Sequence, residues 1–462
     1  MRIAVRLEQG RVADAGFDAE GCGALTAAAS AVVEAVRGEP VLRAALLTPK
    51  EISVALGELS PGKLHAADLA TDALHRAVAL AAKDGAISLP AAPRRTLVAM
   101  SGGVDSAVAA QMALDRGDDV VAVTLELWAD PATDGTASCC SPQAVVGARA
   151  LAHRMGIPHL TLDLRDEFRA GVVDPFLDGY AGGSTPNPCV RCNGFVRFDA
   201  MLALADRLGA ARLATGHYAR IQDDGRGALL ASAADPAKDQ AYMLARLRPE
   251  GLTRLWFPLG GLRKTEVRAR ARRAGLPVAD RRESQDLCFL AGLGKRGFIR
   301  RHGSSERGGE IVDGRGRVLG HHDGQSRYTV GQRRGIGIAA PEPLYVIGKD
   351  ALRRRVTVGP RSALATRIVE VRDARLHRDG AAIDRVRLRY RSRPLRCRIE
   401  GDPGAGEHVR LRLVLAEPAE GVAPGQAACL MRGERVLGIA TIAAPGARAD
   451  EVAAGHEAPY GA

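Results

Sequence analysis

Three cysteines, which lie in two short segments, are candidates for chemistry because of their thiols and their spacing. Cys189 and Cys192 form a Cys-x-x-Cys pair within TPNPCVRCN, and Cys288 lies in ESQDLCF. Arg191 adjoins Cys192, and a cationic neighbour lowers the pKa of a thiol and increases its nucleophilic thiolate form. Two thiols from separate loops could close over one substrate atom. The prolines of the first segment stiffen its backbone, which suits a loop that holds a nucleophile.

The segment SGGVDS (101–106) is the second chemical feature. It follows the apolar, strand-like TLVAM and precedes a helical pattern, AVAAQMALDRG. A strand, a glycine loop and a helix N-terminus expose backbone N–H groups that favour a bound phosphate. The loop lacks the Gly-Lys-Ser/Thr ending of a Walker A loop and the GxGxxG dinucleotide pattern. Two adjacent glycines alone would indicate only a turn, whereas the whole string after a buried strand indicates a nucleotide phosphate site.

This string resembles the PP-loop of the N-type ATP pyrophosphatases. The resemblance implies cleavage of ATP between its α- and β-phosphates, adenylation of a carbonyl oxygen and release of pyrophosphate. Asp105 is then a candidate for contact with Mg²⁺ or pyrophosphate. Because many chemistries share the loop, it indicates a reaction class and leaves the substrate open.

Five motifs, two of which contain the cysteines named above, narrow the substrate. They occur in the order TPNPCVRCN (185–193), ATGHYAR (214–220), KDQAYML (238–244), ESQDLCF (283–289) and YTVGQRRGIGI (328–338). Together they resemble the tRNA-specific 2-thiouridylase family, over residues 95–443. The resemblance implies that ATP activates the C2 carbonyl of the wobble uridine (position 34) of tRNA. A cysteine persulfide would then supply sulfur, giving 2-thiouridine, AMP and pyrophosphate.

The residue roles follow from the same resemblance. Cys288 would carry the persulfide and Cys192 would be the nucleophile that helps to release its sulfur onto uridine; a Cys192–Cys288 disulfide would remain to be reduced. The residues expected to bind ATP are Ala99, Met100, Ser101, Gly102, Gly103, Val104, Asp105, Ser106, Leu125 and Gly216. Those expected to contact tRNA are Asn187, Pro188 and Cys189 at the target base, and His217, Lys238, Asp239, Gln240, Arg389, Tyr390 and Gln426 elsewhere.

Two positions depart from the usual pattern of this family. Ala99 stands where the family usually has glycine, and we expect little effect unless φ there is positive. Cys189 stands where the family varies between Asp and Cys. With this third thiol, Cys189, Cys192 and Cys288 could instead hold an iron–sulfur cluster, which stays open as an alternative. ATP and Mg²⁺ are the cofactors expected first, and no metal ligands are assigned.

The N-terminal segment resembles the iron–sulfur scaffold proteins of the IscU/NifU type. The residues that carry this resemblance are GFDAEGCGALTAAASAVVEAVRG (16–38) and PGKLHAADLATDALHRAV (61–78). Cys22 and His65 match scaffold ligand positions, whereas Ala66 replaces the later cysteine and the stretch with the first cysteine is missing. Two ligands are too few for a stable cluster on one protomer. The segment could dock a cysteine desulfurase, relay sulfur through Cys22, or be a structural remnant; we favour docking.

The elements that must position these residues are predicted from apolar periodicity. Short apolar strands alternate with helices from residue 96 to 300, which predicts an α/β fold with a doubly wound parallel sheet of the PP-loop type. The expected order is an α+β IscU-like domain (1–87), a linker (88–95), the PP-loop catalytic domain (96–300), a central tRNA-binding domain (301–365), a C-terminal β-barrel (366–445) and a disordered tail (446–462).

The charge of the chain favours a polyanionic partner. The formal net charge is +12 and the sequence pI is about 9.6, and a basic balance favours nucleic acid. Five arginines alternate along DRVRLRYRSR, and because a strand has a period of two, we expect their side chains to share one face. Like charges on one face repel, so the pattern favours a phosphate partner. These residues are Arg385, Arg387, Arg389, Arg391 and Arg393.

The remaining expectations concern location, partners and the other thiols. The opening MRIAVRLEQG has no apolar signal-peptide core and no stretch is long and apolar enough for a membrane helix, so we expect a cytoplasmic monomer without structural disulfides. Its partners would be tRNA and a cysteine desulfurase or another sulfur carrier. Cys139 and Cys140 are interpreted as buried or spacer thiols, and Cys397 and Cys429 as small core residues on barrel strands. Two other functions stay open: a PP-loop ligase that acts on a small molecule, and an iron–sulfur carrier.

Overall fold

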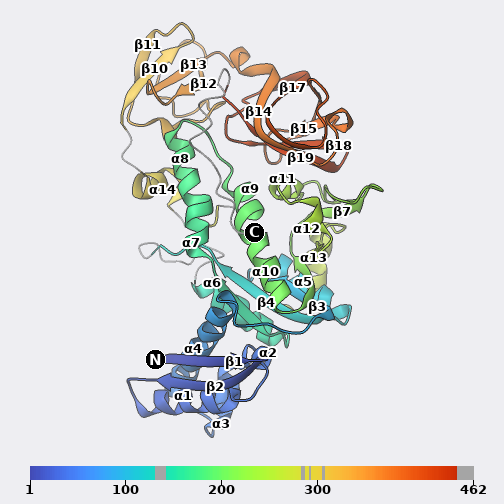
Figure 1. Cartoon of the computed structure of the whole chain (residues 1–462). Helices are drawn as coiled ribbons and strands as arrows, with labels where there is room; N and C mark the ends of the chain where they lie inside the picture. The colour runs from blue at the N-terminus through green and yellow to red at the C-terminus, as the bar shows by residue number, and fades with distance from the viewer. Residues whose placement is uncertain (131–141, 282–286, 291–292, 304–306, 445–462) are drawn as a thin grey trace. The chain divides into compact units, whose positions relative to one another are not determined.

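The computed structural model describes residues 1–130, 142–281, 287–290, 293–303 and 307–444 (Figure 1). The predicted tail (446–462) and the thiols of Cys139 and Cys140 lie outside these residues. The chain divides into two compact units. Unit 1 comprises Met1–Val172, Arg191–Ala241 and Leu247–Gly294, and unit 2 comprises Val173–Val190, Tyr242–Arg246 and Lys295–Ala462. Among the described residues, no helix is long and apolar enough to cross a membrane.

Unit 1 begins with a β-hairpin followed by helices, as expected for an α+β domain. β1 (Arg2–Glu8) pairs antiparallel with β2 (Arg11–Asp18). The helices that follow are α1 (Gly23–Val36), α2 (Val41–Ala44), α3 (Pro49–Ala55) and α4 (Leu64–Lys83). In α4 the residues Ala67, Leu74 and Val78 are fully buried, and their spacing places them on one face of the helix. This amphipathic face packs α4 against both α1 and the strand β5 described next.

A five-stranded parallel sheet forms the centre of unit 1, in the order β5-β4-β3-β6-β9. Its strands are β3 (Ala92–Ala99), β4 (Asp119–Glu126), β5 (His159–Asp163), β6 (Ala210–Thr215) and β9 (Leu255–Trp256). The main helices are α5 (Val104–Asp115), α6 (Pro142–Arg154), α10 (Phe198–Arg207) and α13 (Lys264–Arg273). The predicted parallel α/β sheet is confirmed. β3 begins at Ala92, within the segment that the sequence suggests as a linker (88–95).

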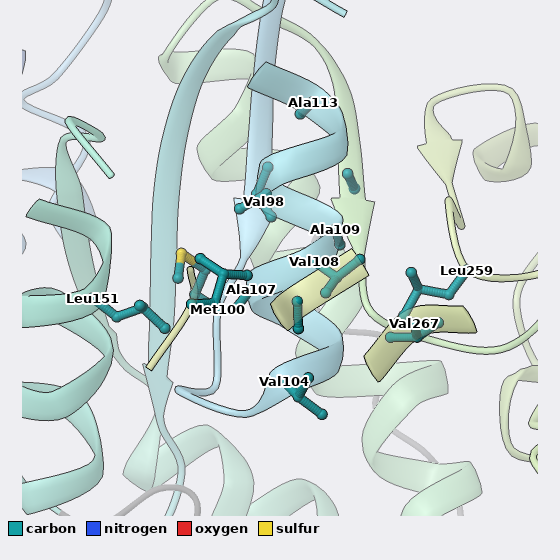
Figure 2. Close-up of a cluster of buried hydrophobic side chains, with 14 of the residues drawn as sticks. Val98, Met100, Val104, Ala107, Val108, Ala109, Ala113, Leu151, Leu259 and Val267 are labelled. Atoms are coloured by element: carbon teal, nitrogen blue, oxygen red, sulfur yellow. The ribbon is translucent and has the colours of Figure 1, made fainter. Parts of the chain in front are cut away.

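The hydrophobic core beneath the glycine loop joins β3, α5, α6 and α13 (Figure 2). Met100, just before the SGGVDS segment, and Val104, the first residue of α5, are both buried in this cluster, together with Val267 of α13. Small residues such as Ala107 and Ala109 cover α5, and they allow the helix to approach the sheet closely. The loop is therefore held at both ends by side chains that point into the core.

Short elements complete unit 1 and lead into unit 2. They are α7 (Arg165–Phe168), a π-helical turn (Arg169–Val173), α9 (Pro188–Cys192), a second π-helical turn (Asn193–Arg197), β7 (Arg220–Asp223), β8 (Ala228–Ala231), α11 (Ala241–Leu244) and α12 (Pro249–Leu252). Unit 2 contains α8 (Asp174–Ala181), most of α14 (Gly294–His302) and two β structures.

The first β structure of unit 2 has the strand order β11-β10-β13-β12. Its strands are β10 (Gly309–Asp313), β11 (Val318–His322), β12 (Tyr345–Asp350) and β13 (Arg355–Gly359). Their core contains Ile311, Val346, Val356 and Val358, all fully buried. The predicted central domain (301–365) thus folds around its own small β core.

The second β structure is the predicted C-terminal barrel. Its strands are β14 (Ala365–Leu376), β15 (Arg385–Arg387), β16 (Leu395–Ile399), β17 (Gly406–Glu420), β18 (Ala427–Arg432) and β19 (Arg435–Ile442). They follow the order β14-β17-β16-β15-β18-β19, and β14 also pairs with β19, which closes the barrel. Cys397 on β16 and Cys429 on β18 lie on barrel strands as predicted, half-buried and buried respectively.

The prediction that the five arginines share one face of a strand is wrong. β15 ends at Arg387, Arg389 to Arg391 form a turn, and Arg391 has a left-handed φ of 60°. Pro394 also cannot donate a ladder hydrogen bond and restricts the residue before it. Arg393 instead forms an exposed ion pair with Glu417, at 2.9 Å. The alternating pattern continues through a turn, so these side chains share no single face.

Candidate nucleotide site and cysteine segments

The glycine loop joins β3 to α5 and is closed by its own serines. The Ser101 backbone N–H donates to Ser106 Oγ at 3.1 Å, and Ser106 Oγ donates to the Gly103 carbonyl at 3.1 Å. Gly102 has a φ of +70°, a left-handed conformation that favours glycine. The Arg281 guanidinium donates to the Gly102 carbonyl at 2.9 Å. The N-terminus of α5 and the loop therefore form the anion-binding arrangement that the sequence predicts.

Gly216, at the end of β6, lies directly against this loop. A Cβ atom at Gly216 would be 2.8 Å from the carbonyl carbon of Asp105 and 2.8 Å from the backbone nitrogen of Ser106. Real Cβ atoms do not approach backbone this closely, so only glycine fits here. Gly216 thus sets the position of the first turn of α5, which is a packing role beside the expected role in ATP binding.

The expected ATP-binding residues differ in what they expose. Met100, Val104 and Leu125 are buried, so their side chains belong to the core. Ser101 is exposed, and Asp105 is partly exposed. Ala99 is the last residue of β3, where an extended backbone suits alanine, so the departure from glycine carries no strain. The groups that this loop presents are therefore backbone N–H groups, the Ser101 hydroxyl and one carboxylate.

Asp105 is held by two side chains that lie far away in the sequence. Lys264 Nζ donates to both carboxylate oxygens of Asp105, at 2.7 and 2.8 Å. The Tyr218 hydroxyl donates to Asp105 Oδ1 at 2.8 Å. Lys264 begins α13, and its side chain is 11% exposed against 30% for Asp105. Val267, one helical turn further along α13, is buried in the core beside α5, which draws Lys264 toward the carboxylate.

The two cysteines expected to do the chemistry both lie in unit 1. Cys192 ends α9 and is 6% exposed, and Cys288 is half-buried. Phe289, next to Cys288, is buried and contacts Phe168 edge to face, with ring centroids 5.8 Å apart. This aromatic contact anchors the Cys288 segment in unit 1. Residues 283–286 of the ESQDLCF motif lie outside the described part of the chain.

The alternative of an iron–sulfur cluster on three thiols gains no support from the geometry. Within the described residues, no group of three or more His, Cys, Asp or Glu side chains is arranged to hold a metal ion.

The surroundings of His217 favour the neutral form of its imidazole. Its Nδ1 lies 2.8 Å from Thr215 Oγ1, and its ring lies near the rings of Phe198 and Phe257, at centroid distances of 5.7 and 6.2 Å. Burial, together with the nearby positive charge of Arg197, lowers the pKa of His217 to about 3. A tRNA contact through His217 would therefore use a neutral imidazole and not a cation.

The KDQ segment of unit 1 has internal partners. Asp239 is buried, and its carboxylate accepts from the backbone N–H groups of Ala233 and Ala241, at 3.0 and 3.2 Å. Gln240 Oε1 accepts from the Tyr218 backbone N–H at 2.9 Å, and the Gln240 N–H donates to the Tyr218 carbonyl at 2.8 Å. Gln240 thus holds the backbone of Tyr218, whose hydroxyl reaches Asp105, while Asp239 fixes the loop that carries Gln240.

In unit 2 the segment before Cys189 is tied to a loop of the barrel. Gln426 Nε2 donates to the Thr185 carbonyl at 2.7 Å, and the Thr185 N–H donates to the Pro424 carbonyl at 2.7 Å. Asn187 Oδ1 accepts from the Val190 backbone N–H at 3.2 Å, which begins the turn at Pro188 and Cys189. The side-chain amide of Gln426 therefore positions the TPNPC loop.

The turn after β15 presents the other expected tRNA contacts of unit 2. Arg389 is exposed and Tyr390 is half-buried. The ring of Tyr390 lies 6.3 Å from that of Tyr242 and has the Arg391 guanidinium 5.3 Å from its centroid. An exposed arginine beside an aromatic ring suits a phosphate and a stacked base.

Family models match almost the whole chain. They describe a NifU-like N terminal domain (residues 1–83), a tRNA methyl transferase HUP domain (94–292), a tRNA methyl transferase PRC-barrel domain (296–360) and an aminomethyltransferase beta-barrel domain (371–442). The tRNA-specific 2-thiouridylases MnmA of Geobacter metallireducens and Acidithiobacillus ferrooxidans are 44% and 42% identical, each over 75% of this chain and over 96% and 97% of their own lengths. The chain belongs to the MnmA family of tRNA-specific 2-thiouridylases.

Because it has an N-terminal domain, this MnmA-family chain is also similar to a second kind of relative. The bifunctional protein NifU/MnmA of Rubrobacter xylanophilus is 45% identical over 445 residues, which cover 94% of this chain and 89% of that protein. In the structure Cys22 is exposed just before α1, and His65 is exposed near the start of α4. Ala66, at the position where the resemblance leads us to expect a scaffold cysteine, is fully buried. The predicted resemblance of this domain to the NifU type is confirmed.

Sequence reasoning missed three residues at the nucleotide site of this MnmA-family chain, namely Lys264, Tyr218 and Arg281. One signal could have found Lys264. The helix macrodipole disfavours a cation at a helix N-terminus, yet Lys264 is the first residue of α13. Such a lysine needs an anionic partner, and Asp105 is that partner.

Proposed function

We propose that this chain forms 2-thiouridine at the wobble uridine (position 34) of tRNA, as a tRNA-uridine 2-sulfurtransferase. Support comes from the family membership together with one observation: the intact SGGVDS segment leads from β3 into the first turn of α5, in the same unit as Cys192 and Cys288. The loop suits adenylation, and the two thiols suit sulfur transfer. A small-molecule ligase would need no second thiol, which argues against that alternative.

ATP would bind at the loop with its phosphates toward the N-terminus of α5. The backbone N–H groups of residues 102–106 and the hydroxyl of Ser101 would donate to phosphate oxygens. Asp105 is the one carboxylate of the loop, and carboxylate oxygen is a ligand that Mg²⁺ prefers. Mg²⁺ would neutralise charge on the departing pyrophosphate. The uridine O2 oxygen would displace pyrophosphate from the α-phosphate, which converts a poor leaving group into AMP.

Sulfur would then replace the activated oxygen in two steps. The terminal sulfur of a persulfide on Cys288 would attack C2, and AMP would leave with the former uridine oxygen. The Cys192 thiolate would attack the Cys288 sulfur, forming a Cys192–Cys288 disulfide and leaving the terminal sulfur on C2 as the thiocarbonyl. The disulfide would be reduced by a thiol before the next turnover. Burial of Cys192 would keep water away from the activated uridine.

Each unit would supply its own contacts to tRNA. Asn187, Pro188 and Cys189 would contact the target base, and Arg389 with Tyr390 would contact its neighbours. His217 would contribute a neutral imidazole, Lys238 a charge, and Asp239, Gln240 and Gln426 would act by holding these segments in place. The net charge of +12 supports a polyanionic partner.

The NifU-like domain would bring sulfur to the reaction. We place the reaction in the cytoplasm and expect the chain to act as a monomer. A cysteine desulfurase would dock on the N-terminal domain and load Cys288, and the exposed Cys22 could relay the sulfur. With two scaffold ligand types retained, we assign this domain no cluster of its own.

Thiolation of unmodified tRNA tests the proposal. Protein purified without air is incubated with ATP, Mg²⁺, cysteine and a desulfurase, and the tRNA is examined by retardation on a mercury gel. Wild type and the control Cys397→Ser should retard the tRNA, whereas Cys192→Ser and Cys288→Ser should not. Loss of product in the control as well would mean that the two thiols are not special. Absence of product with folded, ATP-binding wild type would favour a small-molecule ligase or an iron–sulfur carrier.

A further inference from the structure

The glycine loop contains no cation of its own. A Walker A loop carries a lysine that reaches the β- and γ-phosphates, whereas SGGVDS carries a carboxylate in the equivalent stretch between strand and helix. A carboxylate beside a bound triphosphate repels it unless something neutralises the carboxylate. In the structure, neutralisation comes from Lys264, whose Nζ lies 2.7 and 2.8 Å from the two oxygens of Asp105.

The pairing of Lys264 with Asp105 is built into the packing of two helices. Lys264 is the first residue of α13 and Asp105 lies in the first turn of α5, and these helices pack against each other. The backbone N–H of Lys264 also donates to the Asp235 carboxylate at 3.0 Å, which fixes the start of α13. At 11% exposure, the side chain of Lys264 is shielded, so its charge is screened less than that of a surface lysine.

The tyrosine completes this arrangement. Tyr218 is 3% exposed and its hydroxyl donates to the same Oδ1 atom that Lys264 contacts. Two donors on one oxygen fix the rotation of the carboxylate, which leaves its orientation set before any ligand arrives. Lys264 Nζ also lies 5.8 Å from the centroid of the Tyr218 ring, so the cation contacts both parts of the site.

We propose that Lys264 is a positioning residue of the ATP site: it acts through Asp105, neutralising and orienting that carboxylate so that the triphosphate can bind beside it. This rests on the proposed function only in taking ATP as the ligand of the loop. Without Lys264 the Asp105 carboxylate is left as an uncompensated negative charge. ATP then binds more weakly, and most weakly where no metal screens the phosphates.

A double-mutant cycle on ATP affinity tests the proposal without tRNA or a sulfur donor. The dissociation constant of ATP is measured by calorimetry for wild type, Lys264→Met, Asp105→Asn and the double variant, in EDTA and again with Mg²⁺. Lys264→Met should weaken ATP binding in EDTA by roughly tenfold or more, which is about 1.4 kcal/mol. On the Asp105→Asn background the same change should cost less than about threefold, because coupled residues do not add. With Mg²⁺ the defect of Lys264→Met should shrink.

Two further variants keep the test decisive. Arg272→Met removes an exposed arginine of the same helix, whose partner is Asp280, and should leave ATP affinity unchanged. Tyr218→Phe removes only the hydroxyl, and should weaken binding in wild type but not on the Asp105→Asn background, even if Lys264→Met fails to fold.

Equal losses from Lys264→Met on both backgrounds would show direct contact with ATP and overturn the proposal. A loss below about threefold in wild type would overturn it too. Because thiolation is not measured, failure of the proposed function leaves this result readable.

Discussion

A fall in pH should destabilise the packing of α4 against α6 and β5. This should occur at a higher pH than the protonation of carboxylates that form ion pairs. His75 on α4 is 4% exposed, and its ring contacts that of His153 on α6 with centroids 5.3 Å apart. Burial, and then the nearby charge of Arg149, lower the pKa of His75 from 6.5 to about 3. His159 on β5 is fully buried, and burial lowers its pKa well below the usual value.

The size of the effect follows from the shift of His75. In the unfolded chain this imidazole binds a proton below pH 6.5, whereas in the folded chain it stays neutral down to about pH 3. The stability present above pH 6.5 is therefore lost as the pH falls toward 3. Each pH unit corresponds to about 1.4 kcal/mol, so a fall to pH 5 costs about 2 kcal/mol from His75 alone.

A nearby carboxylate should not obscure this effect. Burial raises the pKa of Asp72, but hydrogen bonds from Arg76 and Arg149 outweigh it, and the net pKa lies below 3.8. Asp72 thus stays ionised between pH 7.5 and pH 5, and its ion pair with Arg149, at 2.8 Å, persists across this range.

Urea unfolding at pH 7.5 and pH 5 measures the effect, with tryptophan fluorescence as the signal. Wild type should lose at least about 2 kcal/mol of unfolding free energy over this range, and His75→Phe should lose about 2 kcal/mol less than wild type. The control His65→Phe changes an exposed histidine of the same helix and should behave like wild type. Equal acid losses in His75→Phe and wild type would refute the reasoning.

Three further changes should have measurable effects. Gly216→Ala should weaken ATP binding by tenfold or more, since a Cβ atom there lies 2.8 Å from the backbone of Asp105; calorimetry with unaltered affinity would contradict this. Phe289→Ala should lower the unfolding free energy by about 3 kcal/mol and slow thiolation, because it removes the buried ring that anchors Cys288; unchanged urea unfolding would contradict this. Arg389→Ala should reduce the slope of log affinity for tRNA against log salt by about 0.7–0.9, as expected for one lost phosphate contact; an unchanged slope would remove Arg389 from the tRNA contacts.

Local patterns predicted much of this fold. Apolar runs with β-branched residues gave the parallel strands, and an unbroken period of two gave most of the barrel strands, because both signals depend on neighbouring residues. The glycine loop was equally local, since Ser101 to Ser106 are consecutive. The alternating arginines gave a wrong prediction because their pattern, too, is only local. A turn with a left-handed residue at Arg391 and a proline at 394 interrupts the strand, and charge alternation alone does not report it.

The partners of the site residues could not be predicted from local patterns. Lys264 is 159 residues from Asp105, and Tyr218 is 113 residues from it. These contacts exist because α13 packs against α5 and because β6 lies beside β3, which are properties of the whole sheet. Similarly, Gln240 was expected at tRNA, and only the fold shows that its amide holds the backbone of Tyr218.

The adenylation of uridine is the central claim, and an isotope experiment tests it most directly. Unmodified tRNA carrying oxygen-18 at the C2 carbonyl of its wobble uridine is incubated with the protein, ATP, Mg²⁺ and a sulfur donor. Mass spectrometry is then applied to both the nucleosides and the AMP. The account predicts 2-thiouridine at the wobble position and one oxygen-18 atom in each AMP formed with it. Thiolated tRNA with unlabelled AMP, or labelled tRNA that stays unthiolated while ATP is consumed, would contradict it.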